Sequence, residues 1–440
     1  MMCSTLAVAW MMVVPVGARQ AAPPEPAATP GQVQPGSPPP PEPKAASPDP
    51  AVTAAETYSV LLGQAWAALS AGDADRAEAF IESSPSAGRG WEASHILAWA
   101  RHAAAHPGLS PEARQGWTLV GGAEPRVNID IDPSSRWLAF GGADAKVHIL
   151  DLATGTEVHA MHALFADKAP EPPKPPEQDR PALRSVFHAV FTRDGSRLVT
   201  GSGDGGVCVF ETGTWKLVDK FREEAQFIAS LAVDRGASKI VAVTTGKNAT
   251  LWKAQPPDAA GKVVYTQVAA LAPALNFGRP AAFTHDGARI ALGGTAACDM
   301  FDAATGAAVA GAGSKLGGGS PYCMSIAFSP DGKWLATGCR GSVSKSVYLF
   351  GIDGTRVYEF QRHARGIQGL SFSPDSRRLL TTSIDGTARL LDAATGVELL
   401  KFDVGVPIRS AVLSGDGKYL ALGTAAGVRL YAPPPKSDQK

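Results

Sequence analysis

Two short stretches of the sequence carry residue types that could bind a ligand. His159 and His162 could place two imidazoles near a metal ion. Gly201–Gly206 fits G-x-G-x-x-G, which cradles a dinucleotide phosphate only when it connects a strand to a helix. The two histidines would point to opposite faces of a strand, and the glycines join two expected strands. We therefore expect neither a metal nor a cofactor at these positions.

The remaining polar residues form no recognisable catalytic set. Asp130 and Asp132 share one face of an expected strand, but two carboxylates do not make a calcium site. The sequence shows no nucleophile motif, Walker loop or paired acid and base. We therefore expect a protein that is not an enzyme and has no cofactor.

The charge of the chain limits the class of partner. The 41 basic side chains balance the 41 acidic ones over 440 residues, and no run of like charge stands out. Nucleic acid and acidic membrane surfaces are bound by basic patches, which this composition does not favour. We expect a protein partner, whose identity the sequence does not give, and no nucleic acid.

The N-terminus contains a candidate export signal in residues 1–18. Residues 6–16 form an apolar run too short to span a bilayer, and Val16-Gly17-Ala18 offers small residues for cleavage after Ala18. Residues 1–5 lack the usual basic side chains. We expect an exported protein, periplasmic, cell-surface or secreted, without a membrane span after cleavage. It would be cytoplasmic if the run is only an apolar terminus.

A proline-rich linker and a helical segment follow. Residues 23–50 contain 12 prolines, so residues 19–51 are expected to form an extended, disordered linker. In residues 52–114 the apolar residues follow a helical period, and Gly72-Asp73 separates the first two expected helices. This segment is expected either to cap the rest of the chain or to bind a partner.

Residues 115–432 contain one pattern seven times. Each copy has a strand, a turn centred on an anchor position, and three further strands; the anchors are Ser134, Asp194, Gly236, Asp286, Asp331, Asp375 and Asp416. Three residues before each anchor the side chain is apolar, and another apolar residue lies 15 to 19 residues after it. A period of about 40 to 45 residues is typical of a four-stranded propeller blade. We predict an all-β fold, a seven-bladed β-propeller of four-stranded antiparallel blades.

The copies resemble known repeats. Phe372-Ser373-Pro374-Asp375, Ser383-Ile384-Asp385-Gly386-Thr387 and Leu391-Asp392 resemble the WD40 consensus, and the likeness covers about residues 117–432. The Trp of its Trp-Asp pair survives only as Trp252, and its Gly-His pair only as His363. In that family a His, a Ser or Thr, an Asp and the Trp form a buried hydrogen-bond set within a blade. Here only blade six could approach this set, with His363, Ser383 and Asp385, and Leu391 stands where the Trp would complete it. Residues 58–84 resemble a tetratricopeptide hairpin.

The last copy is one strand short. It reaches Pro433-Pro434-Pro435, which cannot continue a ladder, so residues 433–440 are expected to be a tail. The spare strand 117–120 is predicted to complete the last blade and close the ring, which removes exposed sheet edges. We expect a monomeric propeller.

The cysteines are expected to be buried thiols rather than a disulfide framework. Cys323 and Cys339 flank one hairpin. If Phe328 faces Leu335, Met324 should face Cys339, so a bridge between the two cysteines would need a bulge.

Successive turns of a blade alternate between the two faces of the disc. The anchor turns lie on one face, here called the Pro-Asp face. The connections between blades lie on the other, here called the loop face, which receives the insertions at 162–185, 311–322 and 340–346. An insertion at 254–262 falls on the Pro-Asp face. Long loops on a rigid scaffold often bind partners, although drifting surface loops are an equal alternative. The candidate interaction residues are Glu171, Lys174, Arg180, Tyr322, Arg340, Lys345, His363 and Arg365.

Two functions remain open. The favoured one is a non-catalytic scaffold that binds a protein through the loop face. The alternative is an exported propeller enzyme, because Asp392-Ala393-Ala394-Thr395-Gly396 is similar to the Asp-x-x-Thr-Gly blades of quinoprotein dehydrogenases. The Trp that follows in those enzymes is absent from residues 397–401.

Overall fold

The structure is a computed structural model that describes residues 49–105, 117–120, 128–166, 185–223, 227–245, 249–271, 280–293, 298–309, 315–316, 323–339, 345–424 and 426–434. All of them belong to one compact unit, Pro48–Lys440. The predicted signal (1–18) and nearly all of the predicted linker lie outside the described residues.

Three helices precede the strands: α1 (Pro50–Ala71), α2 (Ala74–Ser83) and α3 (Trp91–Ala105), with a 3₁₀ turn at Ser86–Gly88. Asp49 caps α1, which begins at Pro50, two residues before the predicted start of the helical segment at residue 52. Gly72 ends α1 with a φ of 87°, a conformation that glycine adopts without strain. The Asp73 carboxylate accepts the Arg76 N–H and so caps α2.

The strands form seven four-stranded antiparallel blades. Blades one to four contain β2 (Ile129–Ile131), β3 (Trp137–Gly141), β4 (Lys146–Asp151), β5 (Thr156–His162); β6 (Val186–Phe191), β7 (Arg197–Ser202), β8 (Gly206–Glu211), β9 (Leu217–Arg222); β10 (Ile228–Val233), β11 (Lys239–Thr244), β12 (Ala249–Ala254), β13 (Tyr265–Leu271); β14 (Ala281–Phe283), β15 (Arg289–Leu292), β16 (Cys298–Asp302), β17 (Lys315–Leu316). Blades five to seven contain β18 (Cys323–Phe328), β19 (Trp334–Cys339), β20 (Val347–Gly351), β21 (Arg356–Phe360); β22 (Ile367–Phe372), β23 (Arg378–Ser383), β24 (Thr387–Asp392), β25 (Glu398–Asp403); β26 (Ile408–Leu413), β27 (Leu420–Thr424), β28 (Gly427–Tyr431) and β1 (Trp117–Val120).

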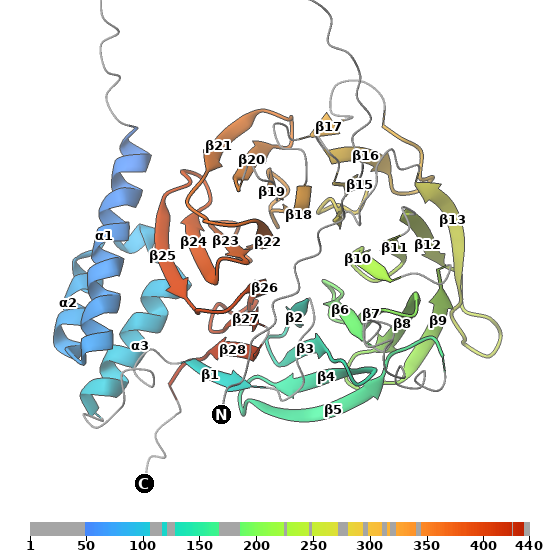
Figure 1. The fold of residues 1–440 in the computed structure, drawn as a ribbon, viewed down its shortest axis with the longest axis horizontal. Helices are drawn as coiled ribbons and strands as arrows, with labels where there is room; N and C mark the ends of the chain where they lie inside the picture. The colour runs from blue at the N-terminus through green and yellow to red at the C-terminus, as the bar shows by residue number, and fades with distance from the viewer. Residues whose placement is uncertain are drawn as a thin grey trace, which may run out of the picture. The chain divides into compact units, whose positions relative to one another are not determined.

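The blades are arranged in a closed ring (Figure 1). The first strand of each blade is the innermost one and contacts the first strand of the next blade, and β26 contacts β2. β1 pairs antiparallel with β28, with Trp117 opposite Tyr431 and Val120 opposite Val428. The outer strand of blade seven thus comes from the N-terminal side of the propeller, which is the closure expected from the count of strands.

Both apolar positions of the repeat lie in the core. The inner set comes three residues before each anchor and is buried or half-buried: Ile131, Phe191, Val233, Phe283, Phe328, Phe372 and Leu413. The outer set packs in the same way: Leu150, Phe210, Trp252, Phe301, Phe350, Leu391 and Tyr431. Because successive strand residues face opposite sides, this spacing in each copy fills the space between neighbouring blades.

A carboxylate closes the anchor turn in most blades. In blade six the Asp375 carboxylate accepts from the Ser373 hydroxyl at 2.5 Å and from the Arg377 N–H at 3.0 Å. In blade one the two roles exchange positions, because Asp132, two residues before the anchor, accepts from the Ser134 backbone N–H. Blade one therefore keeps the same turn although its anchor is not acidic.

The helices pack on the outer edge of blades six and seven, beside β25 and β28 (Figure 1). The Arg378 guanidinium, at the start of β23, donates to the Glu92 carboxylate of α3 through Nε at 3.0 Å and Nη2 at 2.6 Å. Both side chains are buried, and the Tyr58 hydroxyl donates to the same carboxylate at 2.9 Å. The Trp66 ring lies edge-on to Phe402, 5.7 Å between ring centroids. These contacts make the segment a cap on the propeller.

The register of the β18–β19 hairpin differs from the expected one. Phe328 pairs with Leu335 as expected, but a bulge between Cys323 and Ser325 places Cys323, not Met324, opposite Cys339. The expectation that Met324 faces Cys339 was wrong because an extra residue shifts the register by one. Cys208, Cys298 and Cys339 are buried, and Cys323 is half-buried.

Candidate functional site

Three of the eight candidate residues on the loop face are described. Lys345 and Arg365 are exposed, and His363 is buried. The other five, Glu171, Lys174, Arg180, Tyr322 and Arg340, lie outside the described residues.

His363 takes part in a buried hydrogen-bond network in blade six. Its Nδ1 lies 3.1 Å from the Asp385 carboxylate and 3.1 Å from the Thr387 hydroxyl, and its Nε2 lies 2.9 Å from the Thr381 hydroxyl. The Ser383 hydroxyl donates instead to the carbonyls of residues 365 and 366. The network holds the inter-blade connection to the β23–β24 turn, so His363 has a structural role rather than an exposed one.

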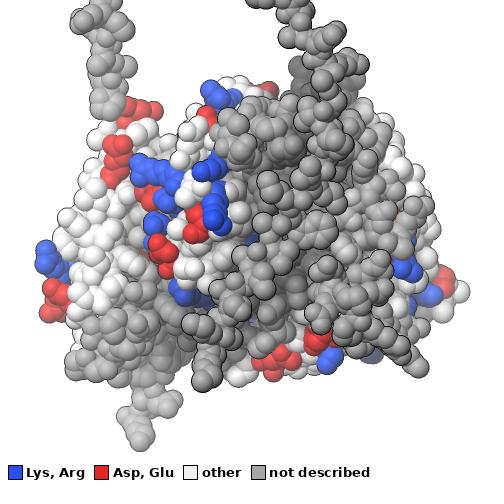
Figure 2. Space-filling model, in the orientation of Figure 1, with Lys and Arg blue, Asp and Glu red and all other residues white. Residues whose placement is uncertain are grey.

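Opposite charges lie close together on the face seen in Figure 2, where basic and acidic side chains alternate near β21 and β25. Arg389 and Glu398 form an ion pair at 2.5 Å, and Lys401 and Asp403 form another at 3.2 Å. Side chains paired in this way give no broad field of one sign.

The larger of two described cavities lies at the mouth of the central channel on the Pro-Asp face. Its volume is about 370 Å³, and its wall comes from the ends of the innermost strands of blades one to six and from the anchor turns of blades one to five. A smaller cavity of about 210 Å³ lies between Trp91 and the anchor turns of blades six and seven. Both cavities open at the end opposite to the predicted loop face.

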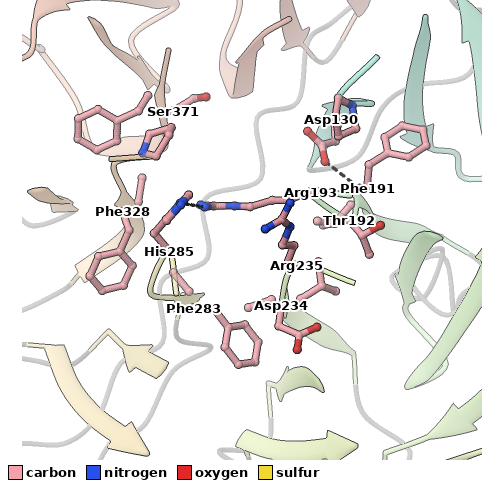
Figure 3. A pocket seen from close by; sticks show the side chains of 18 of the residues that line it. Asp130, Phe191, Thr192, Arg193, Asp234, Arg235, Phe283, His285, Phe328 and Ser371 are labelled. Atoms are coloured by element: carbon pink, nitrogen blue, oxygen red, sulfur yellow. Dashed lines mark hydrogen bonds between the residues drawn. The ribbon is translucent and has the colours of Figure 1, made fainter. Parts of the chain in front are cut away.

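Basic side chains from three consecutive blades reach the larger cavity. Arg193, Arg235 and His285 follow β6, β10 and β14 and line its wall. The Arg193 guanidinium donates to Nδ1 of His285 at 2.5 Å, across the width of blade three (Figure 3). The Asp194 N–H donates to the Arg235 carbonyl at 3.0 Å, which holds the turns of blades two and three side by side.

Asp130 lies in the same wall. Its carboxylate accepts the Ile131 N–H at 2.9 Å and the Phe191 N–H at 2.8 Å (Figure 3). Burial raises the pKa of this carboxyl from its ordinary value of 3.8 to about 7, since desolvation outweighs the two backbone hydrogen bonds. Burial also lowers the pKa of the Arg193 guanidinium.

The sequence interpretation missed this site, although a signal was present. The residue before the anchor is Pro133, Pro330 and Pro374 in blades one, five and six, and Gly415 in blade seven. In blades two, three and four it is Arg193, Arg235 and His285. The repeat was recognised from positions that all seven copies share. The basic residues stand at a position where three adjacent copies differ from the other four.

The two stretches considered first for ligand binding have structural surroundings. The His159 ring packs against Trp215 at 5.7 Å, and Nε2 of His162 donates to the Ala166 carbonyl at 2.7 Å. The glycine pattern runs from β7 to β8 and opens no helix. Within the described ranges, no three His, Cys, Asp or Glu side chains gather as metal ligands, and no helix is long and apolar enough to cross a membrane.

The Asp-x-x-Thr-Gly stretch of blade six is a turn. The Asp392 carboxylate accepts the Thr395 N–H at 3.0 Å and the Thr395 hydroxyl at 2.9 Å. Asp302 bonds Thr305 in the same way, at 2.9 Å and 2.7 Å. These bonds explain the similarity to dehydrogenase blades by turn geometry.

The repeats and the ring define the class of this protein. The profile of the family described as "WD domain, G-beta repeat" (WD40) matches residues 314–350 and 354–392. A chain of a solved structure titled "Crystal Structure of Mitotic Checkpoint Complex" superposes with a TM-score of 0.57 and 16% identity, over 72% of this chain and 90% of that one. The chain therefore carries WD40 repeats within a seven-bladed β-propeller.

Curated relatives match shorter stretches. A "U3 small nucleolar RNA-associated protein 15 homolog" of Xenopus tropicalis is 37% identical over 83 residues, which is 19% of this chain, and "Protein groucho" of Drosophila melanogaster is 30% identical over 111 residues, 25% of this chain. The alignments span 15% of the length of each relative. Neither name indicates an exported protein, so the predicted signal finds no support in them.

Proposed function

We propose that this protein is a non-catalytic WD40-repeat scaffold that binds a protein partner through the loop face of its propeller. One observation carries the proposal. The polar side chains that recur in the repeat are bonded within the fold: Asp375 and Asp392 to their own turns, His363 and Asp385 to each other. Recognition would then fall to segments that interrupt the repeat.

Lys345 and Arg365 are the described residues best placed for such contacts. Both are exposed, at the β19–β20 and β21–β22 connections on the loop face. The surface is proposed to be completed by five residues that lie outside the described ranges, in insertions that the sequence assigns to the same face: Glu171, Lys174, Arg180, Tyr322 and Arg340. The propeller is proposed to be monomeric, because β1 already closes its ring.

The test is affinity capture with the full chain. Deletion of residues 165–182, or the double change Lys345→Glu and Arg365→Glu, should reduce recovery of the partner. Lys262→Glu is the matched control, because Lys262 is exposed in the insertion on the Pro-Asp face. Recovery of the partner that is unchanged in both loop-face variants would contradict the proposed surface.

The alternative is a propeller enzyme similar to quinoprotein dehydrogenases. The Asp392–Thr395 turn gives it less weight, since the carboxylate is used within the blade. A visible-light spectrum after incubation with quinone and calcium separates the two functions. A bound chromophore would favour the enzyme, whereas an unchanged spectrum would favour the scaffold.

The location of the protein is proposed separately. The apolar run at residues 6–16 favours export, whereas the names of the relatives fit the cytoplasmic alternative better. A reporter that folds only after export, fused behind residues 1–50, would decide. Loss of reporter activity when residues 1–18 are removed from the fusion would establish a signal peptide.

A further inference from the structure

We propose that the mouth of the central channel on the Pro-Asp face binds an anionic group, a carboxylate or a phosphate, presented by an acidic peptide segment. The site lies opposite the loop face. It rests on the proposed function only in that a scaffold has peptide partners, and it assigns the chemistry of one of them.

The basic residues of the cavity wall depart from the pattern of the repeat. The residue before the anchor is proline or glycine in four blades and Arg193, Arg235 or His285 in blades two, three and four. Proline and glycine suit tight turns, so the basic residues give up a local preference. Because the three blades are adjacent, their side chains meet on one side of one cavity.

Two of the basic side chains in the cavity wall, Arg193 and Arg235, are arginines. Within the described ranges, no carboxylate forms an ion pair with Arg193 or Arg235. Four other described arginines of the propeller blades have such a partner: Arg136, Arg197, Arg378 and Arg389. The Arg193 guanidinium is partly desolvated by the channel wall but remains exposed to solvent, so an anion can reach it.

Two acidic side chains, Asp130 and Asp234, also lie in the cavity wall. Asp130 is held by two backbone N–H groups, and Asp234 accepts from the Ser238 hydroxyl of its own turn at 2.5 Å. The Asp234 carboxylate points away from the Arg193–His285 pair (Figure 3). Within the described residues neither acid forms an ion pair with the two guanidinium groups, so their N–H donors remain available to a ligand.

The geometry of the basic groups suits an anionic ligand. Arg193 donates to Nδ1 of His285, which leaves the imidazole proton on Nε2 as a further donor. Planar guanidinium groups bind carboxylate and phosphate through two parallel hydrogen bonds. A cavity of about 370 Å³ admits a few side chains of a peptide and is lined below the basic residues by Phe191, Phe283 and Phe328.

The experiment uses the full chain and three fluorescent hexapeptides that differ only at their central residues: two glutamates, two phosphoserines or two glutamines. Binding is measured by fluorescence anisotropy with inorganic phosphate as competitor. The glutamate or the phosphoserine peptide should bind, and the tighter one identifies the source of the anion. The glutamine peptide should bind at least tenfold more weakly.

Arg193→Gln combined with Arg235→Gln should weaken binding of the acidic peptide about tenfold or more, because each change removes charge-assisted hydrogen bonds. Lys333→Gln is the matched control, since Lys333 is 72% exposed in the anchor turn of blade five outside the cavity wall. A thermal melt verifies that each variant is folded.

Equal binding of the acidic and glutamine peptides, absence of binding at millimolar concentration, or affinity unchanged in the double variant would each overturn the proposal. Deleting residues 165–182 should leave peptide affinity within twofold of the wild type. The anion site and the loop face can therefore fail independently.

Discussion

At the scale of single residues, the recurring acids of this propeller act on the backbone around them. Asp130, Asp132, Asp375 and Asp385 each accept from main-chain N–H groups. Each one satisfies main-chain donors that the sheet ladders leave without a partner. The net contribution of each carboxylate to the free energy of folding then depends on how strongly burial disfavours its charged form.

Asp130 is expected to make the protein less stable as pH rises. Its pKa is about 7 in the folded chain and 3.8 when unfolded, so the folded state holds an extra proton between these values. Stability should fall through this window, by at most about 1.4 kcal/mol per pH unit. Urea unfolding from pH 4.5 to 8 should show a flatter profile for Asp130→Asn. The exposed Asp403→Asn should keep the wild-type slope.

Asp385 should behave in the opposite way. Hydrogen bonds from the Thr387 hydroxyl and from two backbone N–H groups, together with His363, outweigh desolvation and lower its pKa to about 2. Its contribution is present above the unfolded value of 3.8 and is lost as pH falls through about 2. Asp385→Asn should cost about 2 kcal/mol at pH 7. A cost that does not shrink between pH 5 and pH 2.5 would contradict this assignment.

At the scale of elements, the helical segment and the propeller share one core. Trp66, Trp91 and Tyr58 are buried or half-buried against blades six and seven, and the Trp99 indole N–H donates to the Ala432 carbonyl at 2.8 Å. This arrangement supports a cap, the first of the two roles expected for the segment. A lone tetratricopeptide-like hairpin would expose the face that is covered here.

The Arg378–Glu92 ion pair should be essential for that packing. Arg378→Ala leaves the buried Glu92 carboxylate without its cation, which is expected to cost about 3 to 5 kcal/mol. The change should also make α3 sensitive to limited proteolysis, because its anchor on β23 is gone. Glu82→Gln is the control, since Glu82 is 61% exposed on α2. A loss below about 1 kcal/mol would show that the apolar contacts hold the helices alone.

The sequence predicted some of these features and missed others for physical reasons. The period of the repeat reveals blades and the apolar sets, because burial constrains Phe372 and Leu391 in the same way in every copy. It does not reveal the bulge beside Cys323, which shifts the register by one residue without altering the hydrophobic pattern. The contact of Arg193 with His285 joins residues 92 positions apart, so local spacing could not show it.

At the scale of the whole molecule, the two faces have different characters. The loop face is the one on which the insertions are expected, and the two cavities described above open on the Pro-Asp face. A rigid ring allows the two faces to bind separate partners, because neither one has to deform for the other to be occupied. Rigidity of this kind depends on closure.

Closure by β1 is expected to make the ring unfold as one unit. β28 pairs with β27 on one side and with β1 on the other, so removing β1 exposes an edge on the last blade. Deletion of residues 115–122 should replace a single thermal transition by a broad one at lower temperature, and should promote association through the open edge. Calorimetry and light scattering measure the two effects. Deletion of residues 436–440, which follow β28, is the control. A melt that stays sharp and unshifted without β1 would mean that contacts between the innermost strands alone hold blades one and seven together.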